Sequence, residues 1–160
     1  MVLNGSCMCG GVQYAVQAEE YMSALCHCTD CQKVPSPSHP IPDLISSPKQ
    51  NAHVAQWTGG AFTSNAVVPR TSFKVTKGTC TSYDAKGASG KINKHFFCPT
   101  CGSGIYTELE IMPDMTCVKA GTLDNKGTEL NGKIDVELYV KDRTGYLSAV
   151  EGAKQAQTME

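Results

Sequence analysis

The cysteines limit what this chain can fold into more than any other feature. There are nine cysteines in 160 residues. Seven of them fall into three short clusters: Cys7 and Cys9 in CMC, Cys98 and Cys101 in CPTC, and Cys26, Cys28 and Cys31 in CHCTDC. Cysteines spaced C-x-C are too close for an unstrained disulfide within the pair. We therefore interpret the clusters as metal ligands.

Charge and hydropathy exclude several classes of function. The formal net charge is −1 and no long basic run occurs, so nothing supports binding to nucleic acid or to an anionic membrane. No apolar run could span a bilayer. The N-terminal MVLNGSCMCGG lacks the pattern of a secretory signal. We expect a single cytoplasmic domain over residues 1–160, in a compartment where thiols stay reduced.

Short alternating runs separated by glycines predict a mostly β fold of short antiparallel strands. Val12, Tyr14 and Val16 alternate after the Gly10-Gly11 turn, and YMSALCHC is a short strand that leads into the cysteines. AVVPRTSFKVTKGT predicts an edge strand, because Pro69 cannot donate to a sheet ladder. KHFFCPTCGSGIYTEL indicates strand, turn and strand, and MTCVKAGTL another strand. In KIDVELYVKDR, apolar residues alternate with charged neighbours: Ile134, Val136, Leu138 and Val140.

Two of the cysteine clusters are complementary pairs. Cys7 and Cys9 together with Cys98 and Cys101 supply four thiolates, the closed tetrahedral set that structural zinc prefers. A glycine just past the second cysteine of CPTC is typical of a zinc knuckle. Such a site would close a long loop and stabilise a domain with a modest core.

The third cluster lacks a fourth cysteine. Three protein ligands and one open position are how catalytic zinc is built. A divalent ion with three thiolates has one net negative charge and is a weak Lewis acid toward water. It suits a soft sulfur ligand better. Cys26, Cys28 and Cys31 therefore predict a catalytic zinc that holds a substrate thiolate while a carbon–sulfur bond is made or broken. The expected cofactors are two Zn²⁺ ions, one structural and one catalytic.

A purely structural alternative stays open for the three-cysteine cluster. His27, or a histidine from residues 34–56, could supply a fourth ligand, although we expect His27 to point away. His95 is more often a strand residue than a ligand. Cys80 and Cys117 stand alone and are expected to be small buried hydrophobes.

The three segments GSCMCGGVQY, CHCTDC and FFCPTCGSGIYTE together resemble the glutathione-dependent formaldehyde-activating enzyme family, also called the centromere protein V domain family. VKAGTLD and YVKDRTGYLSAVEGAKQ are similar to its fungal members. The resemblance spans nearly the whole chain apart from residues 34–56. It implies an Mss4-like fold, or β-tent, with Cys7, Cys9, Cys98 and Cys101 as structural zinc ligands and Cys26, Cys28 and Cys31 as catalytic ones.

The resemblance also implies a carbon–sulfur lyase that acts on a glutathione adduct such as S-hydroxymethylglutathione. The alternative is a zinc-stabilised binding or scaffold module without catalysis. Candidate substrate contacts are the backbone amides of Thr58–Gly60, the Ser64 hydroxyl, and Arg70 for a glutathione carboxylate, although a surface ion pair is the commoner role for such an arginine. The expected partner is a small thiol adduct, with no nucleic acid and no membrane. The sequence leaves a homodimer open.

Residues 34–56 interrupt the family pattern. They hold five prolines of the chain's eight, no glycine and no cysteine, in contrast to the β pattern around them. Val34 codons begin with GT and Gln56 can be encoded by CAG, so we interpret the stretch as a translated intron. The competing interpretation is an active-site lid.

Two expectations follow for the chain's irregular parts. The insertion should be an exposed excursion that leaves Lys33 and Trp57 close in space, with His39 and His53 solvated rather than bound to the open metal position. The tail 153–160 is expected to be flexible, either frayed or a short helix.

Overall fold

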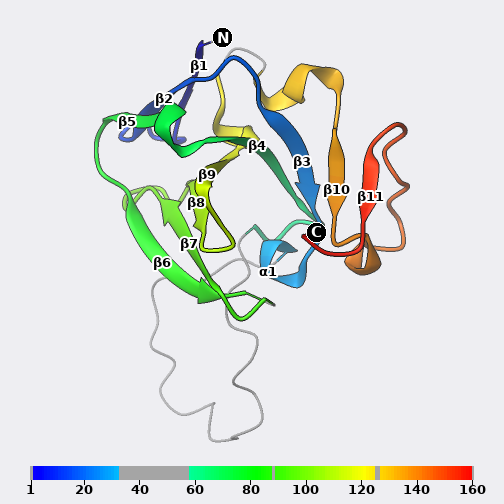
Figure 1. Cartoon of the computed structure of the whole chain (residues 1–160). Coiled ribbons are helices and arrows are strands. Elements are labelled where there is room, and N and C mark those ends of the chain that lie inside the picture. The colour runs from blue at the N-terminus through cyan, green and yellow to red at the C-terminus, as the bar shows by residue number, and fades with distance from the viewer. Residues whose placement is uncertain (1, 33–57, 88, 125–126, 160) are drawn as a thin grey trace, which may run out of the picture.

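The computed structural model describes residues 2–32, 58–87, 89–124 and 127–159 (Figure 1). The strands are β1 (Val2–Ser6), β2 (Gln13–Gln17), β3 (Met22–Cys26), β4 (Thr63–Pro69), β5 (Phe73–Lys77), β6 (Thr81–Lys86), β7 (Ile92–Phe97), β8 (Gly104–Leu109), β9 (Met112–Lys119), β10 (Val136–Leu138) and β11 (Lys154–Ala156). The helical turns are α1 (Thr29–Gln32) and the 3₁₀ turns η1 (Arg70–Ser72), η2 (Ala120–Thr122), η3 (Gly127–Gly132) and η4 (Val140–Asp142).

The strands of the described residues form two sheets. β1, β2 and β5 make a three-stranded antiparallel sheet in the order β1-β2-β5. The remaining strands form an eight-stranded sheet in the order β11-β10-β3-β4-β9-β8-β7-β6. β10 runs parallel to both β3 and β11, and the other pairs are antiparallel. The predicted mostly β class is confirmed, and the antiparallel pairing holds everywhere except at β10.

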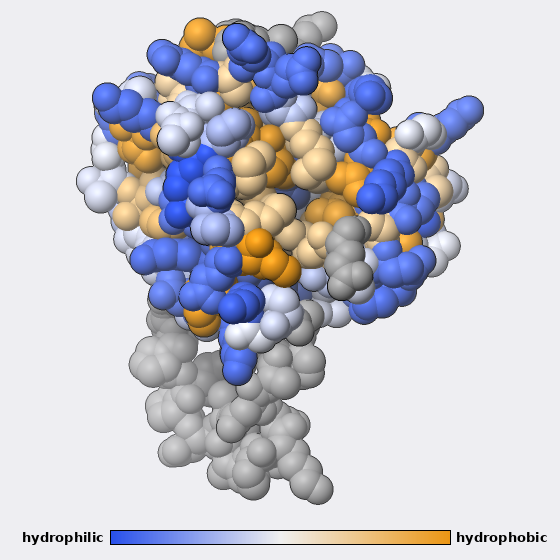
Figure 2. Space-filling model, in the orientation of Figure 1, coloured by the Kyte–Doolittle hydropathy of each residue, from blue (hydrophilic) through white to orange (hydrophobic). Residues whose placement is uncertain are grey.

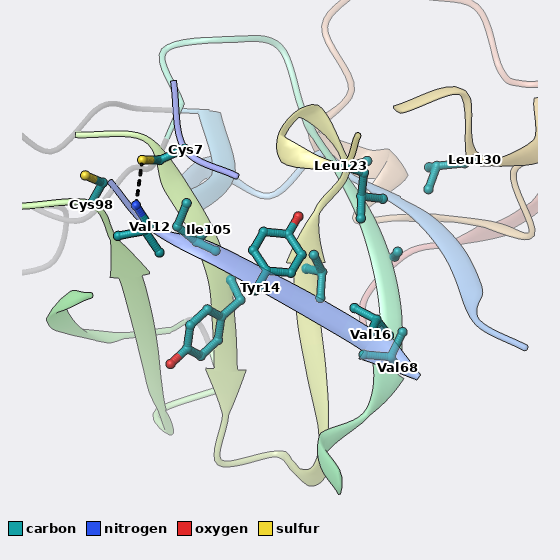
Figure 3. Close-up of a cluster of buried hydrophobic side chains, with 13 residues drawn as sticks. Cys7, Val12, Tyr14, Val16, Val68, Cys98, Ile105, Leu123 and Leu130 are labelled. Carbon is teal, nitrogen blue, oxygen red and sulfur yellow. Dashed lines mark hydrogen bonds between the residues drawn. The ribbon is translucent and has the colours of Figure 1, made fainter. Parts of the chain in front are cut away.

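The main hydrophobic core lies between the two sheets. The predicted alternation in β2 is confirmed, because Val12, Tyr14 and Val16 are all buried in one cluster with Val68 of β4 and Val118 of β9. Figure 3 shows Tyr14 and Val16 along β2 with Val68 close to the end of that strand. Side chains alternate across a strand. Residues next to Val68 and Val118 in sequence therefore face the other side of the eight-stranded sheet.

That other side carries the candidate site. On β4 it presents Asn65 and Val67, and on β9 it presents Cys117 and Lys119, all of which line one cavity. Asn65 lies directly opposite Lys119 in the β4–β9 ladder, and Val67 lies opposite Cys117. The same two strands thus supply both an apolar core face and the floor of a cavity.

The single edge strand predicted over AVVPRTSFKVTKGT is wrong for β4, which contains Pro69, and right for β5. Pro69 is the last residue of β4, which lies between β3 and β9 in the interior of the large sheet. The chain then turns through η1 and continues as β5 at the edge of the small sheet. A proline at a strand end removes no essential ladder bond. Here it marks the point where the chain changes sheet.

The expectations for the C-terminal region also need correction. The strand predicted over Ile134 to Val140 is reduced to β10, because Tyr139 adopts left-handed backbone angles (φ 57°, ψ 45°) that no strand continues through. The tail is neither a helix nor frayed at Lys154–Ala156, since these residues form β11 and pair with β10. Ala156 is buried in a second apolar cluster with Ala24, Val67 and Val136.

The predicted insertion, with His39 and His53, lies outside the described residues, as do Lys33 and Trp57. The described residues on its two sides are in contact, because Thr58 Oγ1 donates a hydrogen bond of 2.6 Å to the carbonyl of Cys31. In the part of the chain that the structure describes, no helix has the length and hydropathy needed to cross a membrane.

Candidate metal centres and active site

The first two cysteine clusters come together as predicted. Sγ atoms of Cys7, Cys9, Cys98 and Cys101 all lie within 4.8 Å of one another. Cys7 and Cys9 sulfurs are 3.5 Å apart, and Cys9 and Cys98 sulfurs are 3.8 Å apart. Zn–S bonds of about 2.3 Å in a tetrahedron place sulfurs about 3.8 Å apart. The four thiols therefore fit a tetrahedral metal site and do not form disulfides with one another.

Tight turns hold these sulfurs in place. Gly10 and Gly102, both with positive φ, donate their amides to the carbonyls of Cys7 and Cys98 and so close each cysteine turn. The Val12 amide donates to Cys7 Sγ at 3.2 Å, as Figure 3 shows. Amide and hydroxyl hydrogen bonds to sulfur favour the thiolate. Hydrogen bonds from Ser103 lower the pKa of Cys101 to about 5.

The third cluster is a separate group of three sulfurs. Cys26 ends β3, whereas Cys28 and Cys31 lie in the turn that leads into α1 and in α1 itself. Their Sγ atoms lie within 4.8 Å of one another, and no histidine, acidic residue or further cysteine of the described ranges joins them. Cys26 and Cys28 sulfurs are 3.4 Å apart. The donor set fits three corners of a thiophilic metal site.

Hydrogen bonds from the far C-terminal region position this loop. The His27 amide donates to the carbonyl of Leu138, and Gln32 Nε2 donates to the carbonyls of His27 and Asp142. His27 itself is 1% exposed. Its Nε2 lies 2.9 Å from Glu137 Oε1, so its ring is engaged with a carboxylate rather than with the three sulfurs.

Glu137 is the centre of a buried polar network that the sequence did not reveal. It is 1% exposed. In addition to His27, its carboxylate accepts hydrogen bonds from Arg143, Gln155 and the amide of Val150. Burial raises its pKa, but these hydrogen bonds outweigh burial and hold the pKa of the Glu137 carboxyl below its ordinary value. The network joins β10 and β11 to the loop that carries the three cysteines.

The three sulfurs lie at one side of a cavity of about 220 Å³. Its walls are largely apolar, with Met22, Ala24, Val67, Leu109, Ile111, Met112 and Leu138. In the view of Figure 2, hydrophobic residues surround a hollow in the middle of the face formed by β3, β4, β8 and β9. A concave, mostly apolar site with a few convergent polar groups is the usual form of a small-molecule site.

Several hydrogen-bonded polar side chains lie on the cavity floor. Lys119 Nζ donates to Asn65 Oδ1 at 2.9 Å, and Asn65 Nδ2 donates to the Thr63 hydroxyl at 3.0 Å. His95 of β7 lies 3.1 Å from the Thr107 hydroxyl through Nδ1. Burial, together with the charge of Lys119, lowers the pKa of His95 to about 4, so this imidazole is neutral near pH 7.

The substrate contacts predicted from the sequence fall elsewhere. Ser64 alternates with Thr63 and Asn65 and is absent from the residues that line the cavity. Arg70 is 40% exposed and lies 3.7 Å from Glu108, the surface ion pair that was its commoner alternative. The Thr58 side chain bonds the Cys31 carbonyl and the Gly60 amide, so it stabilises the loop beside the sulfurs.

The two single cysteines differ from each other. Cys80 packs at the edge of the main core. Cys117, expected to be inert, lines the cavity, and burial raises the pKa of its thiol to about 11. Sequence reasoning missed Lys119, Asn65 and Thr63 as cavity residues. The sequence feature that could have identified Lys119 is its position in MTCVKAG, where a charged residue interrupts a run that is otherwise typical of a buried strand.

Fold and site define a mostly β protein with one closed and one open group of thiols, both suited to metal ions. The chain belongs to the glutathione-dependent formaldehyde-activating enzyme family, whose model matches residues 2–56 and 53–142. The predicted Mss4-like fold is confirmed with it.

A crystal structure of a Rhodobacter sphaeroides protein is similar in fold, with a TM-score of 0.52 and 19% sequence identity over 82% of this chain and 96% of that one. The search of curated proteins finds no match.

Proposed function

We propose that this protein is a zinc-dependent carbon–sulfur lyase that acts on a thiol adduct, with a glutathione adduct such as S-hydroxymethylglutathione as the simplest substrate. One observation carries the proposal. Three sulfurs gather at the side of an apolar cavity, and no fourth ligand from the described residues joins them, while four other sulfurs form a closed set. Membership of the family supports the same chemistry.

In this proposal the seven clustered cysteines form two metal sites with different roles. Cys7, Cys9, Cys98 and Cys101 would hold a structural zinc. Cys26, Cys28 and Cys31 would hold a second one, which when bound supplies a soft coordination position and keeps a substrate sulfur deprotonated near neutral pH. The largely apolar walls of the cavity would contact the organic part of an adduct. They also leave room for an aldehyde larger than formaldehyde.

The test is to measure zinc per chain and then titrate the zinc- or cobalt-loaded protein with glutathione and formaldehyde. We expect two metals per chain, a change in the cobalt absorption of one of them on adding glutathione, and faster exchange between free and adduct formaldehyde in NMR spectra. A scaffold protein would hold both metals with no response to the thiol. That result would refute the lyase proposal.

We also propose that residues 34–56 are dispensable. The match to the family model is broken into two segments, 2–56 and 53–142, and the break falls at the end of this stretch. Cys31 and Thr58 are hydrogen-bonded across the stretch. Deleting residues 34–56 should retain both metals and at least the activity of the full chain. A deletion variant that binds the thiol normally but loses turnover would instead identify the segment as an active-site lid.

A further inference from the structure

The cavity contains a buried lysine whose role the proposed reaction does not yet explain. Lys119 is 9% exposed and lines the same cavity as the three sulfurs. Among the described residues, no carboxylate forms an ion pair with it. A lysine is ordinarily cationic at neutral pH. Hydrogen bonds from Cys26 and Cys28, and then the charge of Lys119, lower the pKa of the Cys31 thiol, so this sulfur compensates the lysine in part. Burying the charge of Lys119 without a full counter-ion is costly. Its position on the floor of the cavity therefore indicates a negatively charged or strongly polar ligand.

Asn65 fixes the direction of this lysine. The two residues face each other across the β4–β9 ladder. Asn65 Nδ2 donates to Thr63 and to the Ala24 carbonyl, which turns Oδ1 toward Lys119 Nζ at 2.9 Å. An ammonium group has three donors. Within the described part of the chain Asn65 accepts from one of them, so Lys119 can donate to a ligand while it keeps this contact.

Among the described residues that line the cavity, Lys119 is the buried lysine. The other lysine in its lining, Lys141, is 52% exposed and paired with Asp142 at 2.8 Å. Asp30 also lines the cavity, from α1. His95 is neutral near pH 7, as its lowered pKa shows. A ligand bound at the three sulfurs would therefore lie near the Lys119 ammonium group on the cavity floor, with apolar walls around it.

We propose that Lys119 is a catalytic residue that donates a hydrogen bond to the oxygen of the thiol–carbonyl adduct. This inference rests on the proposed function. When an adduct RS–CH(OH)–R′ is cleaved, the hydroxyl proton passes to water and the oxygen becomes an alkoxide. An oxygen electron pair then forms the C=O bond, and the electron pair of the C–S bond leaves with sulfur as the thiolate RS⁻. In synthesis the same bonds change in reverse. In both directions negative charge develops on the oxygen, and a fixed donor there lowers the barrier.

The competing role for Lys119 is electrostatic compensation of the three thiolates. In that case the lysine would serve the metal site and not the ligand. The two roles differ in what happens when the charge is removed. A counter-charge is needed for metal retention, whereas an oxygen-binding group is needed for ligand discrimination and turnover.

The experiment compares Lys119→Met with Lys74→Met, an exposed strand lysine in β5 of the other sheet. Calorimetry on the zinc-loaded proteins measures the affinity for mercaptoacetate and 3-mercaptopropionate against ethanethiol and propanethiol. We expect the wild type and Lys74→Met to bind at least one acid at least tenfold more tightly than the alkanethiol of equal length. Lys119→Met should bind the alkanethiol normally and lose the preference for the acid. Its kcat for the adduct should fall about 100-fold, with KM changed less than threefold.

Each other outcome decides against some part of the proposal. Loss of one zinc in Lys119→Met, or no preference for the acids in the wild type, overturns it. A loss that falls in KM alone makes Lys119 an anchor and overturns its catalytic role. Should Lys119→Met fail to fold, Lys119→Arg keeps the charge and should keep the acid preference with reduced kcat, and loss of that preference again overturns the proposal. If the wild type turns over no adduct but its acid preference depends on Lys119, the lyase proposal fails while the anion site stands.

Discussion

The two cysteine groups consist of the same kind of ligand atom, but one links residues that are far apart in sequence and the other links residues within a single short segment. The four-sulfur group joins two tight turns that lie 89 residues apart in sequence, beside the main core. The three-sulfur group is contained within six positions of one loop and faces a cavity. A link between distant residues constrains the unfolded chain far more than a local one. The comparison indicates that the four-sulfur group stabilises the fold, whereas the three-sulfur group is placed where a ligand can reach it from the cavity.

The largest expected effect comes from breaking the four-sulfur group. Cys98→Ser should abolish zinc binding at this group and lower the free energy of unfolding by several kcal/mol, because structural zinc contributes an apparent binding free energy of roughly 10–16 kcal/mol in small domains. Circular dichroism melts and zinc per chain measure the outcome. A variant that still melts like the wild type would show that the main core alone holds the two sheets together.

The matched change in the three-sulfur group should leave the fold intact. Cys28→Ser should remove one zinc per chain and reduce lyase turnover on the order of 1,000-fold. Its free energy of unfolding should change by about 1 kcal/mol or less, because the metal there closes only a short loop. The same melts and metal analyses apply. If Cys28→Ser destabilised the protein as much as Cys98→Ser, the division between a stabilising and an accessible group would be wrong.

An intermediate loss of stability is expected when the buried Glu137 network, which contacts the three-sulfur loop through His27, is broken. Glu137→Gln removes the charge that Arg143, Gln155 and the Val150 amide surround, and that His27 contacts. Breaking a buried charged network costs about 3 kcal/mol. We expect that loss in chemical denaturation, together with faster release of the metal from the neighbouring loop. Glu19→Gln, an exposed carboxylate, is the control.

The Glu137 network also predicts a dependence on pH. The folded-state pKa of Glu137 is below its ordinary value of 4.5. Its contribution to stability is therefore complete above that value and is lost as the pH falls through the folded-state pKa. In the wild type, stability should decline in this acidic range. In Glu137→Gln the decline should be smaller, and equal declines in the two proteins would contradict this role for the carboxylate.

The difference between the two groups also explains what the sequence could predict. Cysteine spacing is local information, so both groups and the turn at Gly102 follow from CMC, CPTC and CHCTDC. Glu137 was one of the charged neighbours in the alternating run KIDVELYVKDR, and no role was predicted for Lys119 in MTCVKAGTL. Both are buried, because β10 lies between β3 and β11, and β9 lies between β4 and β8. Which strands are interior depends on long-range pairing. The error about the tail at β11 is what concealed the burial of Glu137.

The smallest expected effect concerns a charge outside the cavity. Arg70 was a sequence candidate for binding a glutathione carboxylate, but it is 40% exposed and 3.7 Å from Glu108. An exposed ion pair contributes about 0–1 kcal/mol. Arg70→Ala should therefore change the free energy of unfolding by less than about 1 kcal/mol and leave KM for the adduct within twofold. A tenfold rise in KM with unchanged stability would mean that the substrate extends beyond the cavity, around the end of β4. The accessible region of the molecule would then be larger than the three sulfurs and the cavity that they face.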